Sequence, residues 1–72
     1  MTYEIQIWFH AQEGGKFLAE PHVVIEHQNE GSAYEQYNSI IVYDPFHIQL
    51  VVYDVDGNGD ILEEDGTWEM IE

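Results

Sequence analysis

The chain has 72 residues, with 15 Asp and Glu residues but only one Lys or Arg, so its formal net charge is −14. Charge of this sign repels phosphates and excludes direct nucleic-acid binding, and no apolar run reaches the roughly 18 residues that a membrane span needs. The length predicts a single acidic domain, residues 1–72, and the absence of cysteine excludes disulfides and thiolate metal sites.

The first half of the chain predicts two strands. Residues 3–10 alternate with period two, which predicts one face formed by Tyr3, Ile5, Ile7 and Phe9 and another formed by Glu4, Gln6, Trp8 and His10. A turn at 13–16 precedes a second strand around 23–25, and Pro21 favours a strand start or an edge there. Another turn is predicted at 29–32.

The middle of the chain carries signals of both helix and strand. Ser32 and Glu35 have the spacing of a helix capping box, so 32–39 forms either one or two helical turns or a short strand or ordered loop. Residues 40–43 are β-branched and aromatic, which predicts a strand. Residues 46–53 alternate again, with Phe46, Ile48, Leu50 and Val52 expected inward and His47 outward.

Two hairpin signals follow, at residues 56–59 and at Asp65-Gly66. Segments this close in sequence favour pairing with their neighbours. We therefore predict an all-β fold, or an α+β fold with one short helix. Its core would be a small antiparallel sheet of five to six strands, or a partly open barrel, built from hairpins.

The acids are concentrated at the C-terminal end, where no base interrupts them: Asp54, Asp56, Asp60, Glu63, Glu64, Asp65, Glu69 and Glu72. A solubilising or disordered acidic tail is one interpretation. The acids alternate, however, with apolar residues such as Val55, Ile61 and Trp68, in which disordered acidic tracts are poor. This pattern favours a folded, electronegative surface that meets a metal ion or a basic partner.

The first hairpin would bring like charges together. If Asn58 and Gly59 are its two loop residues, Asp54 lies opposite Glu63 and Tyr53 lies opposite Glu64. Like charges directly opposite each other destabilise a strand pair. A cation, or Lys and Arg side chains of a partner, would relieve the conflict, so we predict a functional site at this hairpin.

Residues 54–65 also resemble the calcium-binding loop of the EF-hand family. The first, third and fifth positions are Asp54, Asp56 and Asn58, the sixth is Gly59 and the twelfth is Asp65. The resemblance implies a calcium site formed by Asp54, Asp56, Asn58, Asp60 and Asp65, with weak affinity because the family usually has Glu at the twelfth position. A hairpin with no specific metal, and so no cofactor, is the interpretation that we favour, because the strand alternation of residues 46–53 and Gly66 do not fit the helices that flank an EF-hand loop.

The remaining candidates are aromatic residues and histidines. Trp8, Tyr43 and Tyr53 fall on polar faces of the predicted strands, and aromatic side chains beside charges are typical of interface hot spots. A second core layer formed by Trp8, Val51 and Tyr53 is the alternative. The four histidines lack the spacing of a zinc-binding pair and are expected at the surface: His10, His22, His27 and His47.

Enzymatic chemistry finds no support, because the sequence has no Cys nucleophile, no Gly-x-Ser-x-Gly elbow and no phosphate-binding loop. In size and charge the chain resembles phage-encoded acidic DNA-mimic inhibitors, a group that includes many anti-CRISPR proteins and inhibitors of restriction and repair enzymes. The resemblance implies a non-enzymatic protein that blocks a basic nucleic-acid-binding protein, such as a CRISPR effector, a nuclease or a repair enzyme, in the cytoplasm of an infected or host cell.

The predicted partner-binding residues combine the acids and the aromatics: Asp54, Asp56, Asp60, Glu63, Glu64, Asp65, Glu69, Trp8, Tyr43 and Tyr53. Two other functions are kept as alternatives. One is a small calcium-binding module that uses the 54–65 loop. The other is an antitoxin or immunity-type protein that neutralises a basic toxin. A homodimer also remains open.

Overall fold

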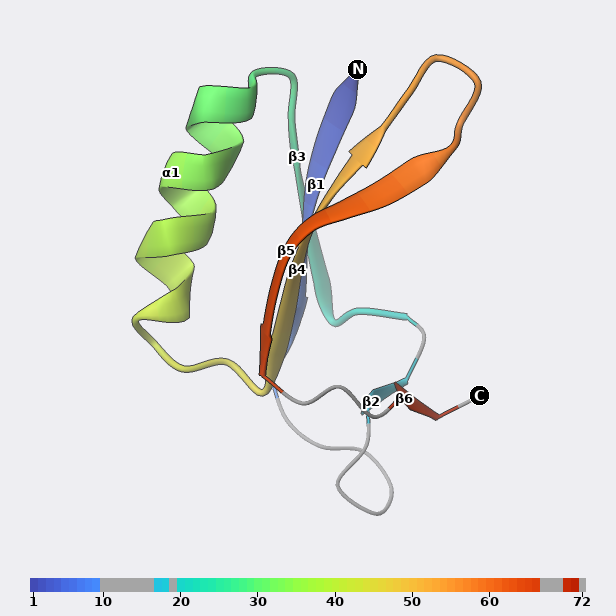
Figure 1. Ribbon diagram of the computed structural model, residues 1–72. Helices are drawn as coiled ribbons and strands as arrows, with labels where there is room; N and C mark the ends of the chain where they lie inside the picture. Colours follow the sequence, from blue (N-terminus) through green and yellow to red (C-terminus); the bar gives the residue numbers. More distant parts are fainter. Residues whose placement is uncertain (10–16, 19, 67–69, 72) are drawn as a thin grey trace.

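The computed structural model describes the backbone of residues 1–9, 17–18, 20–66 and 70–71, and the side chains of 1–9 and 20–66 (Figure 1). One helix covers one face of an antiparallel sheet, and a pair of very short strands lies near one end of that sheet (Figure 1). The elements are β1 (Thr2–Trp8), β2 (Phe17–Leu18), β3 (Val23–His27), α1 (Glu30–Ile41), β4 (His47–Tyr53), β5 (Gly59–Gly66) and β6 (Met70–Ile71).

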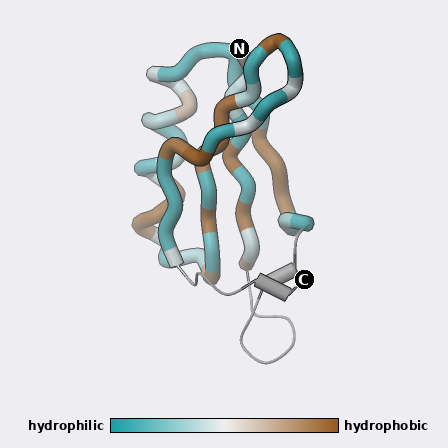
Figure 2. The backbone as a smooth tube through the Cα atoms, turned by 45° about the vertical axis from the view of Figure 1, so that its right-hand side comes forward, coloured by the Kyte–Doolittle hydropathy of each residue, from teal (hydrophilic) through white to brown (hydrophobic). Residues whose placement is uncertain are grey.

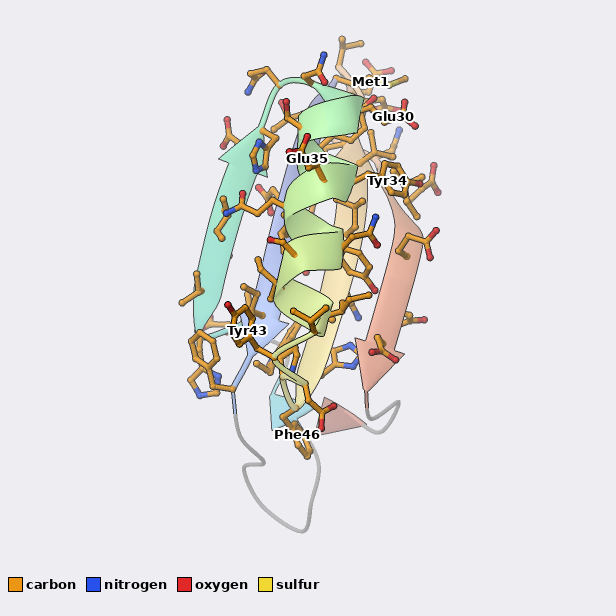
Figure 3. The ribbon with its side chains drawn as sticks, turned by 90° about the vertical axis from the view of Figure 1, so that its left-hand side faces the viewer. Met1, Glu30, Tyr34, Glu35, Tyr43 and Phe46 are labelled. Atoms are coloured by element: carbon orange, nitrogen blue, oxygen red, sulfur yellow. The ribbon has the colours of Figure 1, made fainter. Side chains whose placement is uncertain are left out.

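The main sheet has the strand order β3-β1-β4-β5. β1 pairs antiparallel with both neighbours, so that Ile5 lies opposite Ile25 on β3 and Leu50 on β4. β3 and β4 therefore run parallel, and α1 connects them across β1 in a split βαβ arrangement. Figure 3 shows α1 lying along the sheet, with β3 and β5 at the two edges.

This architecture confirms an antiparallel sheet with one helix, which makes the fold α+β, but the main sheet has four strands rather than five or six. Its two edges are not joined, so among the described residues it is an open sheet and not a barrel. β6 pairs in parallel with β2, with Phe17 opposite Met70. Of the second arm of the hairpin predicted at Asp65-Gly66, residues 67–69 lie outside the described part of the chain, and Met70 and Ile71 pair with β2 and not with β5 as predicted.

The core lies between α1 and the sheet. Its fully buried members come from β1, α1 and β4: Ile5, Ile7, Ala33, Tyr37, Ile48 and Leu50. The period-two alternation of β1 and β4 places their Ile and Leu residues on this face, and alternating apolar and polar bands follow the strands in Figure 2. Phe9 was expected on the same face, but it follows the last residue of β1 and is 56% exposed.

The helix begins after Asn29, whose extended backbone and side-chain oxygen, 3.0 Å from the backbone N–H of Ser32, form the N-cap. The strand predicted at 40–43 is wrong, because Ile40 and Ile41 form the last turn of α1. Both pack on the core at helical spacing from Ala33 and Tyr37, and this burial overrides their β propensity. The chain leaves the helix through Asp44, which adopts a left-handed conformation (φ 54°).

The face of the sheet opposite α1 is partly buried as well. Trp8 and His47 lie directly opposite each other on β1 and β4, with ring centroids 5.0 Å apart in an edge-to-face arrangement. Trp8 is 2% exposed, and His47, which was expected at the surface, is fully buried. Val51 is buried on the same face. Trp8 and Val51 thus belong to a second buried layer, which is the alternative that the sequence left open.

Candidate functional site

The acids of the C-terminal region lie mainly on the hairpin formed by β4 and β5. We use the name acidic hairpin for residues 54–66, which carry Asp54, Asp56, Asp60, Glu63, Glu64 and Asp65. Its turn lies at the same end of the molecule as the N-terminus, and β5 forms one edge of the sheet (Figure 1). Glu69 lies outside the described residues, as does His10.

The turn of the hairpin is built around Asp54. Its backbone N–H donates to the carbonyl of Asn58 (3.0 Å), and its carbonyl accepts from the N–H of Gly57 (3.0 Å). The carboxylate oxygen Oδ1 accepts from the backbone N–H groups of Asp56 (2.9 Å) and Asn58 (3.0 Å). These hydrogen bonds, that with Asn58 foremost, lower the pKa of Asp54. Asp54 therefore has a structural role in closing the turn.

This turn is longer than the two-residue loop predicted at Asn58-Gly59, and the longer turn shifts the strand register. Tyr53 lies opposite Gly59, and Glu63 lies opposite Leu50. The predicted pairs of Asp54 with Glu63 and Tyr53 with Glu64 are therefore wrong. The close approach of two carboxylates that they implied is absent from this hairpin.

Strand alternation divides the acids of β5 between two faces, and a β-bulge interrupts the register before Glu63. The register shifts between Leu50 and Val51, which leaves Leu62 as the extra residue. Beyond it, Glu63 and Asp65 lie opposite Leu50 and Ile48 and so share the face covered by α1, whereas Glu64 lies opposite Gln49 on the other face. All side chains of β5 are exposed except that of Glu64, which is half-buried.

On the α1 side, the carboxylates act on Tyr37. This residue is 4% exposed, and its pKa is raised to about 12 by burial first and then by Asp65, Glu63 and Glu64. No Lys or Arg occurs among the described residues to offset these charges, because Lys16 lies outside them. The acids of β5 therefore form one uncompensated field over this edge of the sheet.

On the opposite face, Glu64 on β5 belongs to a row of polar residues that crosses the sheet through Gln49 on β4 to Gln6 on β1. Gln49 Nε2 donates to Glu64 Oε2 at 3.4 Å and lies 3.0 Å from His47 Nε2, which is itself 3.8 Å from Glu64 Oε2. Gln6 on β1 lies opposite Gln49, and its Nε2 donates to the Tyr53 hydroxyl at 3.2 Å. Glu64 is thus held in place by neighbours, unlike the exposed acids of β5.

The structure also brings together two acids that the sequence could not pair. Glu4 and Glu26 lie directly opposite each other on β1 and β3, on the face away from α1. Each accepts a hydrogen bond from a neighbouring glutamine, from Gln6 at 3.2 Å and from Gln28 at 3.0 Å. Alternation places Glu4 on this face, but only the register between the strands reveals a like-charged pair.

The three aromatic residues do not form one surface. Trp8 is buried, and Tyr53 packs over the turn, where a Cβ added at Gly59 would lie 2.7 Å from the Tyr53 ring. Tyr43 is 84% exposed and follows α1, at the end away from Glu30 (Figure 3). The aromatic hot spot predicted from Trp8, Tyr43 and Tyr53 is therefore not assembled.

The ligand set expected from the calcium-loop resemblance is not brought together either. Asp54 follows Tyr53 at one end of β4, whereas Asp65 lies opposite Ile48 at the other. Five strand positions separate Tyr53 from Ile48, a distance of roughly 17 Å, which exceeds any shared calcium coordination sphere. Over residues 1–9 and 20–66, no group of three or more His, Asp and Glu side chains is arranged to hold a metal ion.

The chain was also compared with known proteins. A scan against models of protein families found no match, and searches of curated proteins and of solved structures found no similar protein. Within the part of the chain that the structure describes, no helix is long and apolar enough to cross a membrane. The acidic hairpin is therefore the candidate site because of its geometry and charge.

Proposed function

We propose that the protein is a non-enzymatic inhibitor whose acidic hairpin occupies the nucleic-acid-binding surface of a basic protein. The observation that carries the proposal is β5, an exposed edge strand with four carboxylates: Asp60, Glu63, Glu64 and Asp65. A one-signed surface of this kind attracts a basic partner and increases its association rate at low salt. A CRISPR effector, a nuclease or a repair enzyme fits this description.

The spacing of the carboxylates supports mimicry of phosphates. Glu63 and Asp65 are two residues apart on one face of β5, so their Cα atoms are separated by roughly 6.6 Å. Phosphates along one strand of DNA repeat at about 3.4 Å in axial rise, so this separation is close to two repeats. A groove lined with Lys and Arg for phosphates can therefore meet the carboxylates instead.

The test is capture of proteins from a host lysate, with and without competing duplex DNA. We expect the protein to retain basic nucleic-acid-binding proteins, and DNA to displace them. A variant with Asp60, Glu63 and Asp65 changed to Lys should lose this capture at least about tenfold, because the partner's cleft now meets like charge. Glu64 is left intact because its contacts with Gln49 contribute to the fold.

The matched control changes Glu20, Glu26 and Glu35 to Lys, three exposed acids away from the hairpin. It alters the net charge by the same amount and should keep most of the capture. Thermal unfolding of both variants checks that each is folded. Equal capture by the two variants, or capture that DNA does not displace, would show that the acidic hairpin does not occupy a nucleic-acid site. Capture of a basic toxin in place of a nucleic-acid-binding protein would favour the antitoxin alternative.

A further inference from the structure

We propose that β5 accepts an extended, basic segment of the partner as an additional strand along its free edge. The inference depends on the proposed function and specifies how the partner docks. In the strand order β3-β1-β4-β5, β5 pairs with β4 on one side and with no other described strand on the other. An edge strand presents backbone N–H and C=O groups on its outer side, and these can pair with a strand of another chain.

The two edge strands of the sheet, β5 and β3, differ in length, exposure and number of acids. β5 has eight residues, and all of its side chains except that of Glu64 are exposed. β3 has five residues, half-buried at alternate positions, and Glu26 is its only acid. The longer, more exposed and more acidic edge is therefore the one suited to an incoming strand.

The positions of the acids determine the chemistry of that strand. Glu63 and Asp65 share the α1 side of β5, and Glu64 lies on the other side. Residues of an added strand that lie beside Glu63 and Asp65 are also two positions apart and share a face. Oppositely charged side chains in such cross-strand positions stabilise the pairing. The partner segment should therefore carry Lys or Arg at alternate positions.

An apolar contact would add to this charge complementarity. Ile61 is 53% exposed and Leu62 is 36% exposed, next to the acids on the same strand. An aliphatic side chain of the partner that lies beside Ile61, on the face away from α1, would cover it. The preferred segment is thus an alternation of basic and β-branched residues, and not simply a polycation.

A second copy of the chain does not meet this requirement. Each copy has a net charge of −14, and pairing of two β5 strands would place carboxylates beside carboxylates, which is destabilising. Acids on an edge strand also prevent edge-to-edge aggregation. If the acids only protected the edge from aggregation, the protein would not prefer a peptide with free backbone N–H groups over one without them. This difference can be tested.

The test compares two synthetic eight-residue peptides with Lys at alternate positions and Val or Thr between them. The control peptide has the same sequence but is N-methylated at every residue, so it keeps the charge and can pair along neither of its edges. We expect the control to bind about tenfold or more weakly, because several backbone hydrogen bonds are lost. The unmodified peptide should slow amide hydrogen exchange in β5 and not in β3.

A charge-neutral variant provides a second measurement. Leu62→Pro removes one N–H at the bulge, a position of an edge strand where proline is tolerated, and obstructs an added strand without altering the net charge. The variant should bind the two peptides equally. Should thermal unfolding show that it does not fold, the exchange measurement on the wild type decides.

Three results would overturn the inference: equal affinity of the wild type for both peptides, exchange protection at β3, or a homodimer with protected β5 amides in the absence of peptide. Failure of the proposed function is distinguishable from these. If both peptides bind equally but DNA still displaces captured proteins, inhibition through charge stands and strand addition is wrong. If the peptides discriminate but no nucleic-acid-binding protein is captured, strand addition stands and the proposed inhibition is wrong.

Discussion

Together with burial, the acidic hairpin raises the pKa of one buried residue, Tyr37. Its side chain packs in the core between α1 and the sheet, and burial together with Asp65, Glu63 and Glu64 raises its pKa to about 12. All these influences favour the neutral phenol, because an ionised Tyr would be both desolvated and repelled. The ionisation of Tyr37 is therefore a probe of whether the three carboxylates lie where the structure places them.

The raised pKa predicts a loss of stability at high pH. The unfolded chain releases the Tyr37 proton near the ordinary pKa of 10, whereas the folded chain keeps it until about 12. The stabilisation is fully present below pH 10 and is lost as the pH rises toward 12. Urea unfolding across this range should show a decline on the order of 1 kcal/mol that Tyr37→Phe removes. Tyr43→Phe, at an exposed site, is the control, and an identical pH dependence in the two variants would contradict the placement.

Among the elements, the backbone path of the acidic hairpin depends on glycines with positive φ at its turn and at the end of β5. Gly57 lies in the Asp54–Asn58 turn with φ 86°, and Gly66 ends β5 with φ 99°. Only Gly66 is also in close contact with backbone, since a Cβ there would lie 2.3 Å from the carbonyl oxygen of Phe46. β4 begins at His47, directly after Phe46, and His47 lies opposite Gly66. Gly66 therefore permits the close approach of β4 and β5 where β5 ends.

Alanine substitutions separate backbone strain from this close approach. Gly57→Ala meets no atom within 4 Å, so its cost is conformational only, about 1–2 kcal/mol. Gly66→Ala adds a clash with backbone and should cost about 3 kcal/mol or more. The free energy of unfolding in urea measures both. Equal losses in the two variants would mean that β5 does not approach Phe46 as described.

At the scale of the whole molecule, the net charge of −14 on 72 residues opposes compaction. The carboxylates of β5, and the opposed Glu4 and Glu26, contribute repulsion that no Lys or Arg among the described residues offsets. Stability is retained because the two layers on either side of the sheet bury apolar side chains, among them Leu50 and Trp8.

This balance predicts that salt stabilises the fold and weakens binding to a basic partner. The Debye length falls from about 10 Å at 0.1 M to about 3 Å at 1 M, which screens the internal repulsion. A gain of about 1 kcal/mol would raise the Tm by roughly 4–8 °C in a domain of this size. Thermal unfolding in sodium chloride tests this, and the variant with Asp60 and Asp65 changed to Asn and Glu63 to Gln should respond less. A Tm independent of salt would show that repulsion is not a significant term.

Composition and periodicity were sufficient to predict the sign of the surface charge, the position of the acids along the chain and the two central strands of the sheet. Alternation correctly predicted the buried faces of Ile5 and Ile7 on β1 and of Ile48 and Leu50 on β4, because the side-chain period of a strand is a local property. Net charge is likewise a sum over residues and needs no fold. Both could therefore be read without knowing which segments pair.

The features that depend on pairing between distant segments became visible in the folded chain and not before. It placed Ile40 and Ile41 in a helix, because packing against the sheet outweighs β propensity. It buried Trp8 and His47 on the second face of the sheet, and it separated Asp65 from Asp54 along the hairpin. Register, strand order and the covering of a face are set by contacts between distant residues, which composition and periodicity do not contain.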